Sequence, residues 1–370
     1  FDVSGKTLKI DHGLFGDSAA ILNAANALQV RGGALSDTLT LNLANLDFIP
    51  SGGINFAGGN GAGNDTLTIT GYTLDTADGV ADVTVNHTDQ EMGQHEGNIV
   101  FATLGTVTFS EIEPLLLSGT AADLVINLPA GDDATVVLRD DTGALANFSE
   151  IDGAFEVTTF TNPTNSLTIN DPLLGAKTIS VQGLDMMFIA DLSILDADAS
   201  DNNVVTFANA TDTHGGDLLV EALTINVNAN ISTIAGGNIL LHAAGDIVIN
   251  ADVQSGSGNI TLHAGDDIAL NTNVDILTSA PGTIYLYAGN NTVDAISGVD
   301  LSARGSSITA TNSDIRIVAD HEGDILLGIV KAGSGDVSLI AERSILDRAA
   351  NSALAGDVTA PNNQITVADA

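Results

Sequence analysis

A short acidic stretch in the middle of the chain has the residue types that bind calcium. Asp196, Asp198 and Asp201 lie within six residues, and Asn202 and Asn203 follow directly. Calcium takes roughly six to eight oxygen ligands, which carboxylates and amides from one loop can supply. The stretch lacks the glycine and the terminal glutamate of an EF-hand loop. Two interpretations therefore stay open, a calcium site and a solvated acidic turn.

Asn64 and Asp65 form a second candidate for calcium, within the sequence GAGNDTLT at residues 61–68. This sequence matches half of the calcium-binding repeat G-G-x-G-x-D-x-U-x. Asn60 replaces the first glycine of the pair, and no second copy follows. Half a repeat cannot complete the coordination of calcium, so the alternative is a tight turn that precedes a strand.

The segment HTDQEMGQHE holds side chains that can bind transition metals, namely those of His87, Asp89, Glu91, His95 and Glu96. Spacing by four residues brings His87, Glu91 and His95 to one face only in a helix. The flanking residues alternate as in a strand, so the pattern favours a polar loop over a metal site.

Three ring-bearing residues, His242, His263 and Tyr287, occupy equivalent positions in a repeated phrase. If successive copies form adjacent strands, roughly 4.8 Å apart, the rings stack as a ladder on the outer face. Such a ladder either binds a glycan or stabilises the outer sheet by side-chain stacking.

The sequence carries no recognisable catalytic motif. It has no nucleophile elbow, no P-loop and no cysteine. Its ten lysine and arginine residues are scattered singly, whereas lyases acting on uronates need basic side chains. Carboxylate pairs that an inverting glycosidase would need also occur in ordinary turns. They are Asp132/Asp133, Asp140/Asp141 and Asp266/Asp267. We expect no enzyme, with a β-helix polysaccharide hydrolase or lyase as a remaining hypothesis.

The elements that would position these residues follow from a repeat in the last third of the chain. GNILLHA at residues 237–243 returns as GNITLHA at 258–264, as GTIYLYA at 282–288 and as SITA at 307–310. The anchors Ile239, Ile260, Ile284 and Ile308 are separated by 21, 24 and 24 residues. Short alternating strands at a period of roughly 20–29 residues indicate a solenoid. We therefore predict an all-β fold, a right-handed parallel β-helix with protruding loops.

Strand alternation predicts which side chains form the interior. The four isoleucine anchors should form one inward column, and Leu241, Leu262 and Leu286 a second. Further strands are expected at the patterns that start Gly245-Asp246-Ile247, Asp266-Asp267-Ile268, Ser313-Asp314-Ile315 and Gly323-Asp324-Ile325.

We divide the chain into three regions that form one continuous solenoid. Residues 1–36 form an irregular segment or cap, in which residues 18–30 are either a short helix or a loop. Residues 37–226 form irregular coils with loops, and residues 227–370 form regular coils. The chain starts at Phe1 and its last residues still read as a strand. We therefore expect a processed product or a piece of a longer protein.

Composition excludes several classes of partner. The net charge of −37 disfavours nucleic acid, which is bound through lysine and arginine. The chain has no apolar run long enough for a transmembrane helix, so we expect no membrane insertion. So high a density of aspartate repels itself at low salt and suits a salt-rich or calcium-rich extracellular medium. The absence of cysteine excludes a disulfide framework.

Two resemblances arise at these residues. The G-x-I-x-L-x-A strands and the G-D-I strands over residues 235–345 resemble the filamentous-haemagglutinin type of β-helix. Residues 38–208 resemble repeats of very large secreted bacterial proteins with Calx-beta-like or haemolysin-type neighbours. The residues that carry this second resemblance are GGINF at 52–56, GAGNDTLTI at 61–69 and FEVTTFTNPTNSLTIN at 155–170. Both resemblances imply an exported architectural segment.

The expected function is that of a structural segment of a secreted or cell-surface bacterial protein, such as a fibre, stalk or adhesin shaft. Self-association end to end is the expected partnership. The alternative is a calcium-dependent module that binds glycans or neighbouring cells. No cofactor is expected, apart from calcium in that alternative.

Overall fold

A computed structural model shows an all-β chain. It describes residues 7–10, 27–44, 49–59, 64–76, 80–88, 95–131, 134–141, 143, 145–171, 175–196, 202–289, 298–347, 358–359 and 364–365. These residues contain strands and turns but no helix. They form two compact units, residues 1–177 with 185–190, and residues 178–184 with 191–370. The predicted change of character at residue 227 falls inside the second unit.

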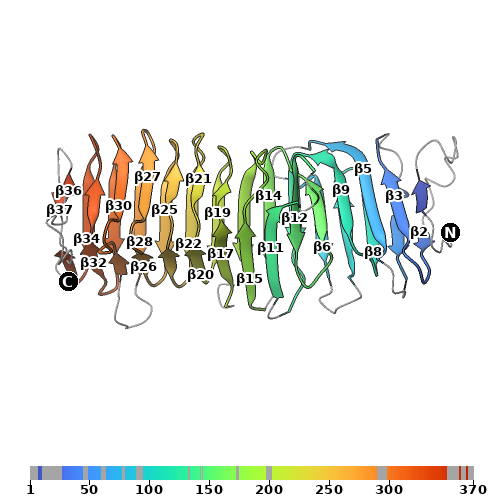
Figure 1. The fold of residues 1–370 in the computed structure, drawn as a ribbon, viewed down its shortest axis with the longest axis horizontal. Coiled ribbons are helices and arrows are strands. Elements are labelled where there is room, and N and C mark those ends of the chain that lie inside the picture. The colour runs from blue at the N-terminus through green and yellow to red at the C-terminus, as the bar shows by residue number, and fades with distance from the viewer. Residues whose placement is uncertain are drawn as a thin grey trace. The chain divides into compact units, whose positions relative to one another are not determined.

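Unit 2 consists of coils of three strands, and the strands of successive coils form three sheets (Figure 1). Sheet 2B holds β15 (Lys177–Gln182), β17 (Val204–Asn209), β20 (Thr224–Val227), β23 (Ile247–Ile249), β26 (Ile268–Leu270), β29 (Gly298–Asp300), β32 (Asp324–Leu327) and β35 (Ser344–Asp347). Sheet 2C holds β18 (Thr211–Asp212), β21 (Ile231–Thr233), β24 (Val253–Ser255), β27 (Asp275–Ser279), β30 (Ser307–Thr311), β33 (Ile329–Lys331) and β36 (Val358–Thr359). Sheet 2A holds β16 (Asp191–Asp196), β19 (Leu218–Ala222), β22 (Ile239–Ala243), β25 (Ile260–Ala264), β28 (Ile284–Ala288), β31 (Ile315–Ala319), β34 (Val337–Ala341) and β37 (Gln364–Ile365).

Identical positions of successive coils pair in parallel and in register. Ile239 pairs with Ile260, which pairs with Ile284, and Leu241 and Leu262 form a matching column with Leu286. All of these side chains have no exposed surface. The prediction of a parallel β-helix is therefore confirmed. The prediction that the isoleucine and leucine side chains of the repeated strands point inward is confirmed as well. The interior is a stack of aliphatic side chains, as a solenoid requires because one coil cannot bury its own apolar face.

The fourth anchor, Ile308, was assigned to the wrong column. It lies in β30 of sheet 2C, where it pairs with Ile276. The partner of Ile284 in sheet 2A is Ile315, which the sequence pattern had assigned to the other series of strands. Nine residues (289–297) separate β28 from β29, whereas three (265–267) separate β25 from β26. A step of 24 residues from Ile284 therefore ends in sheet 2C, before the chain returns to sheet 2A. The two sheets share the same short pattern of a small polar residue followed by isoleucine.

Unit 1 has two sheets in its described part. Sheet 1B has the strand order β1 (Thr7–Ile10), β3 (Thr38–Asn42), β5 (Thr66–Leu74), β9 (Leu115–Ala121), β13 (Thr158–Thr161), β12 (Phe148–Asp152) and β11 (Ala134–Asp140). Sheet 1A has the order β2 (Leu28–Arg31), β4 (Ile54–Ala57), β8 (Gly105–Ser110), β7 (Gly97–Phe101), β6 (Val83–His87), β10 (Asp123–Asn127) and β14 (Ser166–Asp171). Strand β2 occupies the end of the candidate helix 18–30, and residues 18–26 lie outside the described residues.

The uneven spacing of strands in unit 1 has a cause that the sequence did not reveal. Strands β6, β7 and β8 form an antiparallel meander, and its outer members pair in parallel with β10 and β4. Strands β11, β12 and β13 do the same in sheet 1B, where β13 pairs in parallel with β9. The extra residues therefore add strands to the sheets, where only protruding loops were expected.

Candidate functional site

The ring column lies on the outer face of sheet 2A. The rings of His242 and His263 have centroids 4.7 Å apart and an interplanar angle of 13°, so they stack face to face. Tyr287 lies at the same separation from His263 but at 87°, edge to face. The Tyr287 hydroxyl donates a hydrogen bond of 3.0 Å to Oδ2 of Asp320. Burial, together with the neighbouring His242, lowers the pKa of His263.

This stacking limits what the column can bind. The facing surfaces of the two imidazole rings cover each other, and the Tyr287 edge closes the remaining face of His263. A sugar ring needs an open aromatic face, so the column offers little beyond its outer edges. His242 is the first ring of the column along the chain, and its Nδ1 lies 4.0 Å from Oε1 of Glu221. A carboxylate therefore lies beside this ring.

The next outward column on the same strands holds Tyr285 and Arg316. The guanidinium carbon of Arg316 lies 5.8 Å from the centroid of the Tyr285 ring, a cation–π arrangement. These two residues line a surface groove of about 440 Å³, together with Thr283, Asp314, Asp336 and other residues of β28, β31 and β34. Sequence reasoning missed this groove because it assigned Ile315 and Arg316 to a different series of strands from Tyr285, whereas the two strands are neighbours in sheet 2A.

The calcium candidate at Asn64 and Asp65 is part of a buried hydrogen-bonding arrangement in unit 1. Asp65 is 2% exposed, and its Oδ1 accepts a hydrogen bond of 2.6 Å from the Asp37 backbone N–H. Burial raises the pKa of Asp65; the carboxylates of Asp37 and Glu111 add to this, and the Asp37 amide offsets part of it. Asn64 is exposed. The two predicted ligands thus lie in different environments.

The calcium candidate at Asp196, Asp198 and Asp201 begins at the end of β16. Asp196 is half-buried there, and Asp198 and Asp201 lie outside the described residues. Within the described ranges, no group of three or more histidine, aspartate or glutamate side chains has an arrangement that could hold a metal ion. Calcium binding at Asn64, Asp65 and Asp196 stays a prediction.

His87 from the HTDQEMGQHE segment faces the core of unit 1. It is 3% exposed, its ring lies 4.4 Å from that of Phe155, and its Nε2 is 3.3 Å from Oγ1 of Thr158. Burial, with a smaller effect of His95, lowers the pKa of His87 to about 3. The imidazole is therefore neutral at physiological pH. Asp89 and Glu91 lie outside the described residues, and Glu96 is exposed.

Glu156 is a buried acid that the sequence did not single out. It has no exposed surface, and no described donor makes a hydrogen bond to either carboxyl oxygen. Burial, reinforced by the charge of Glu113, raises its pKa to about 9, although the nearby Leu115 amide offsets part of the effect. The carboxyl group is therefore protonated at neutral pH.

Another groove lies on the outer face of sheet 1A, with a volume of about 480 Å³. Its polar lining includes Arg31, Glu96 and Glu111, and its aromatic lining residues are Phe56 and Phe109. Both phenylalanine side chains are only 1% exposed. The groove can therefore form hydrogen bonds with a polar ligand but presents no open aromatic face.

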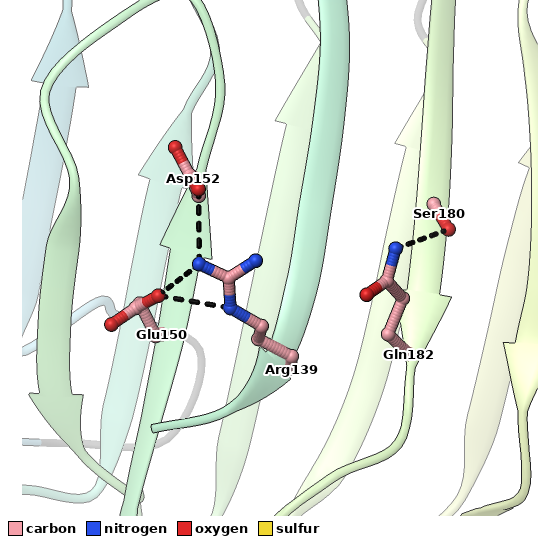
Figure 2. Close-up of polar contacts among 5 residues, drawn as sticks. All are labelled: Arg139, Glu150, Asp152, Ser180 and Gln182. Carbon is pink, nitrogen blue, oxygen red and sulfur yellow. Dashed lines mark hydrogen bonds and ion pairs between the residues drawn. The ribbon is translucent and has the colours of Figure 1, made fainter. Parts of the chain in front are cut away.

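Arg139 on β11 joins two carboxylates of the neighbouring strand β12 in unit 1 (Figure 2). Its Nε and Nη2 atoms lie 2.9 and 2.5 Å from Oε1 of Glu150, and Nη2 lies 3.0 Å from Oδ2 of Asp152. The network links cross-strand neighbours and has the geometry of sheet stabilisation. In unit 2, Gln182 donates a hydrogen bond of 3.4 Å to Ser180 on the same strand (Figure 2).

Many acidic residues of unit 2 form ladders at the corners between strands. Before sheet 2A, a side-chain oxygen of each member except the last accepts a hydrogen bond from the backbone N–H of the equivalent residue in the next coil. The members are Asp191, Asp217, Asn238, Asn259 and Thr283, at distances of 2.7, 2.7, 2.9 and 2.9 Å. Asp314 and Asp336 repeat the contact at 2.8 Å.

A second ladder lies before sheet 2C. Oδ1 of Asn230 accepts from the Asp252 N–H at 3.2 Å, and Oδ1 of Asp252 accepts from the Asp275 N–H at 2.8 Å. The ladders give these aspartates and asparagines a structural role, because their oxygens satisfy backbone donors that the corners leave without a strand partner.

Comparisons with known protein families, with curated proteins and with solved structures found no match to this chain. In the described part of the chain, no helix is long and apolar enough to span a membrane.

Proposed function

We propose that this chain is a structural segment of a secreted or cell-surface bacterial protein, such as a fibre, a stalk or an adhesin shaft. The observation that supports this best is the register of unit 2, in which coil after coil repeats the same backbone pairing and the same interior columns. The resemblance of residues 235–345 to filamentous-haemagglutinin β-helices agrees with this role.

The mechanical argument rests on how each coil is held by the next. Three parallel strand pairs and the side-chain ladders before sheets 2A and 2C connect adjacent coils. Separating two coils therefore requires many hydrogen bonds to break together, while the aliphatic interior becomes exposed to water. A stack of this kind resists bending and proteolysis, which suits an extracellular spacer.

The charge supports the same role outside the cell. A net charge of −37 keeps a repetitive protein soluble, but it also generates self-repulsion that salt screens. We therefore propose a salt-rich extracellular location. End-to-end association is part of the proposal, since strands at the end of a solenoid have unpaired backbone groups that another chain can pair with.

The test uses the full chain in calcium-free and calcium-containing buffer at physiological salt. Sedimentation and electron microscopy are expected to show linear oligomers that lengthen with protein concentration, in both buffers. Dispersed monomers at every concentration would contradict end-to-end association. Oligomers only with calcium, together with a calorimetric heat of calcium binding, would favour the calcium-dependent adhesive module. Release of reducing sugars from a panel of polysaccharides would overturn the structural role in favour of an enzyme.

A further inference from the structure

The groove beside Tyr285 lies on the outer face of sheet 2A, where β28, β31 and β34 begin. Tyr285 pairs in register with Arg316, and Arg316 pairs with Ser338, so three successive coils contribute to its floor. Asp314 and Asp336 line one side. Its volume of about 440 Å³ falls within the range of small-molecule sites, which is roughly 300–1,000 Å³.

Arg316 has donor capacity that the protein does not use. Arg139, Arg343 and Lys177 each form ion pairs with carboxylates. Arg316 is exposed and forms no ion pair with any described residue, although two aspartates line the same groove. Its guanidinium group instead lies over Tyr285. A guanidinium group has five N–H donors, so most of them are available to a ligand.

The two aspartates supply the groove with hydrogen-bond acceptors, whereas Arg316 supplies donors. Oδ1 of Asp314 accepts the Asp336 backbone N–H at 2.8 Å, which holds the first carboxylate in place. Asp336 ends this part of the ladder, and no described donor forms a hydrogen bond to its side chain. A groove thus combines an aromatic ring, a guanidinium donor and carboxylate acceptors within three coils.

From this combination we propose that the groove between Tyr285, Arg316 and Asp336 binds a neutral glycan. Arg316 lies over one face of the Tyr285 ring, so the apolar C–H face of a sugar can pack only on the part of the ring that Arg316 leaves open. The sugar hydroxyl groups both donate and accept hydrogen bonds. Hydrogen bonds to charged groups are the stronger ones. Arg316 would repel a basic peptide, and the aspartates would repel an acidic sugar or an acidic peptide. A neutral polyhydroxyl ligand can form hydrogen bonds with both the guanidinium group and the carboxylates, and neither repels it. This inference does not depend on end-to-end association.

The experiment is calorimetric titration of the full chain with neutral oligosaccharides built from glucose, mannose, galactose and N-acetylglucosamine. Tyr285→Ala and Arg316→Ala are each expected to weaken binding by at least about tenfold. Tyr285→Phe should bind as the unmodified chain does, because it keeps the ring face. Tyr287→Phe, on the neighbouring column, and Arg343→Ala are matched controls that should leave affinity unchanged. Thermal unfolding of every variant reports whether the fold is intact.

Three results would overturn the proposal: no binding of any neutral probe, binding that survives both Tyr285→Ala and Arg316→Ala, or a preference for uronate-containing or sialylated probes. A basic peptide that competes at the groove would likewise assign the site to a different class of ligand.

Discussion

Nζ of Lys177 lies 3.0 Å from Oδ1 of Asp171, and the side chains of both residues are buried, with exposures of 0% and 1%. Nζ also donates a hydrogen bond of 3.3 Å to the Gly131 carbonyl oxygen. A buried ion pair of this kind adds little net stability over an apolar pair, because both charges lose their hydration. Removal of one partner is much more costly, since the remaining charge stays buried.

Lys177→Met is therefore expected to lower the free energy of unfolding by about 3–5 kcal/mol, because Asp171 would lose its counter-charge. Urea denaturation followed by circular dichroism measures the change. The double variant Lys177→Met, Asp171→Leu should recover much of the loss. Lys331→Met, at an exposed lysine, is the control and should change stability little. Equal effects of the two methionine variants would contradict this account of the ion pair.

Glu156 should make stability depend on pH. Its folded-state pKa is about 9, above the ordinary value of 4.5, so the folded state holds a proton that the unfolded state releases. Stability from this group therefore falls as pH rises from about 4.5 to about 9. Glu156→Gln should remove that dependence and stabilise the chain at pH 7, by a free energy on the order of 3 kcal/mol. Denaturation midpoints across this pH range test it, with exposed Glu96→Gln as the control. A Glu156→Gln profile parallel to that of the unmodified chain would refute the raised pKa.

Gly258 is required by the close approach of coils. A Cβ atom there would lie 2.2 Å from the carbonyl oxygen of Gly237, and one at Gly282 would lie 2.1 Å from that of Gly258. Gly258→Ala must push two backbones apart and is expected to destabilise the chain by about 1–3 kcal/mol. Ser257→Ala, at the exposed neighbouring position, should change stability by less than about 0.5 kcal/mol. Thermal unfolding of both variants measures the difference, and a neutral Gly258→Ala would show that the coils can separate freely.

Asn238 is the ladder member whose side chain both donates and accepts. Its Nδ2 donates to Asp217 at 3.1–3.2 Å, and its Oδ1 accepts from the Asn259 N–H at 2.9 Å. Asn238→Ala should lower the free energy of unfolding by about 1 kcal/mol. Asn238→Asp keeps the acceptor but places a second negative charge beside Asp217, so its destabilisation should shrink as salt is added. Gln254→Ala, an exposed residue on β24, is the control. A salt-independent effect of Asn238→Asp would mean that charge repulsion is not its cause.

The repeat and the alternation of side chains could be read from the sequence because both are local. The repeated strands β22, β25 and β28 have an isoleucine followed two positions later by a leucine, and this alternation assigns Ile239, Ile260 and Ile284 to the interior. His242, His263 and Tyr287 are equivalent because each occupies the same position in the repeated strand. Sequence reasoning did not foresee that Tyr287 meets His263 edge to face, because the ring angle depends on the hydrogen bond from its hydroxyl to Asp320.

The tertiary structure decided which strand meets which. Ile308 and Ile315 carry nearly the same local pattern, but Ile308 pairs with Ile276 in sheet 2C and Ile315 pairs with Ile284 in sheet 2A. The antiparallel meanders of unit 1, the burial of Glu156 and the contact of Arg316 with Tyr285 likewise depend on pairing between segments far apart in the chain. The periodicity of the sequence specifies which face of a strand is apolar. Backbone pairing and packing over the whole unit determine which strands lie beside it.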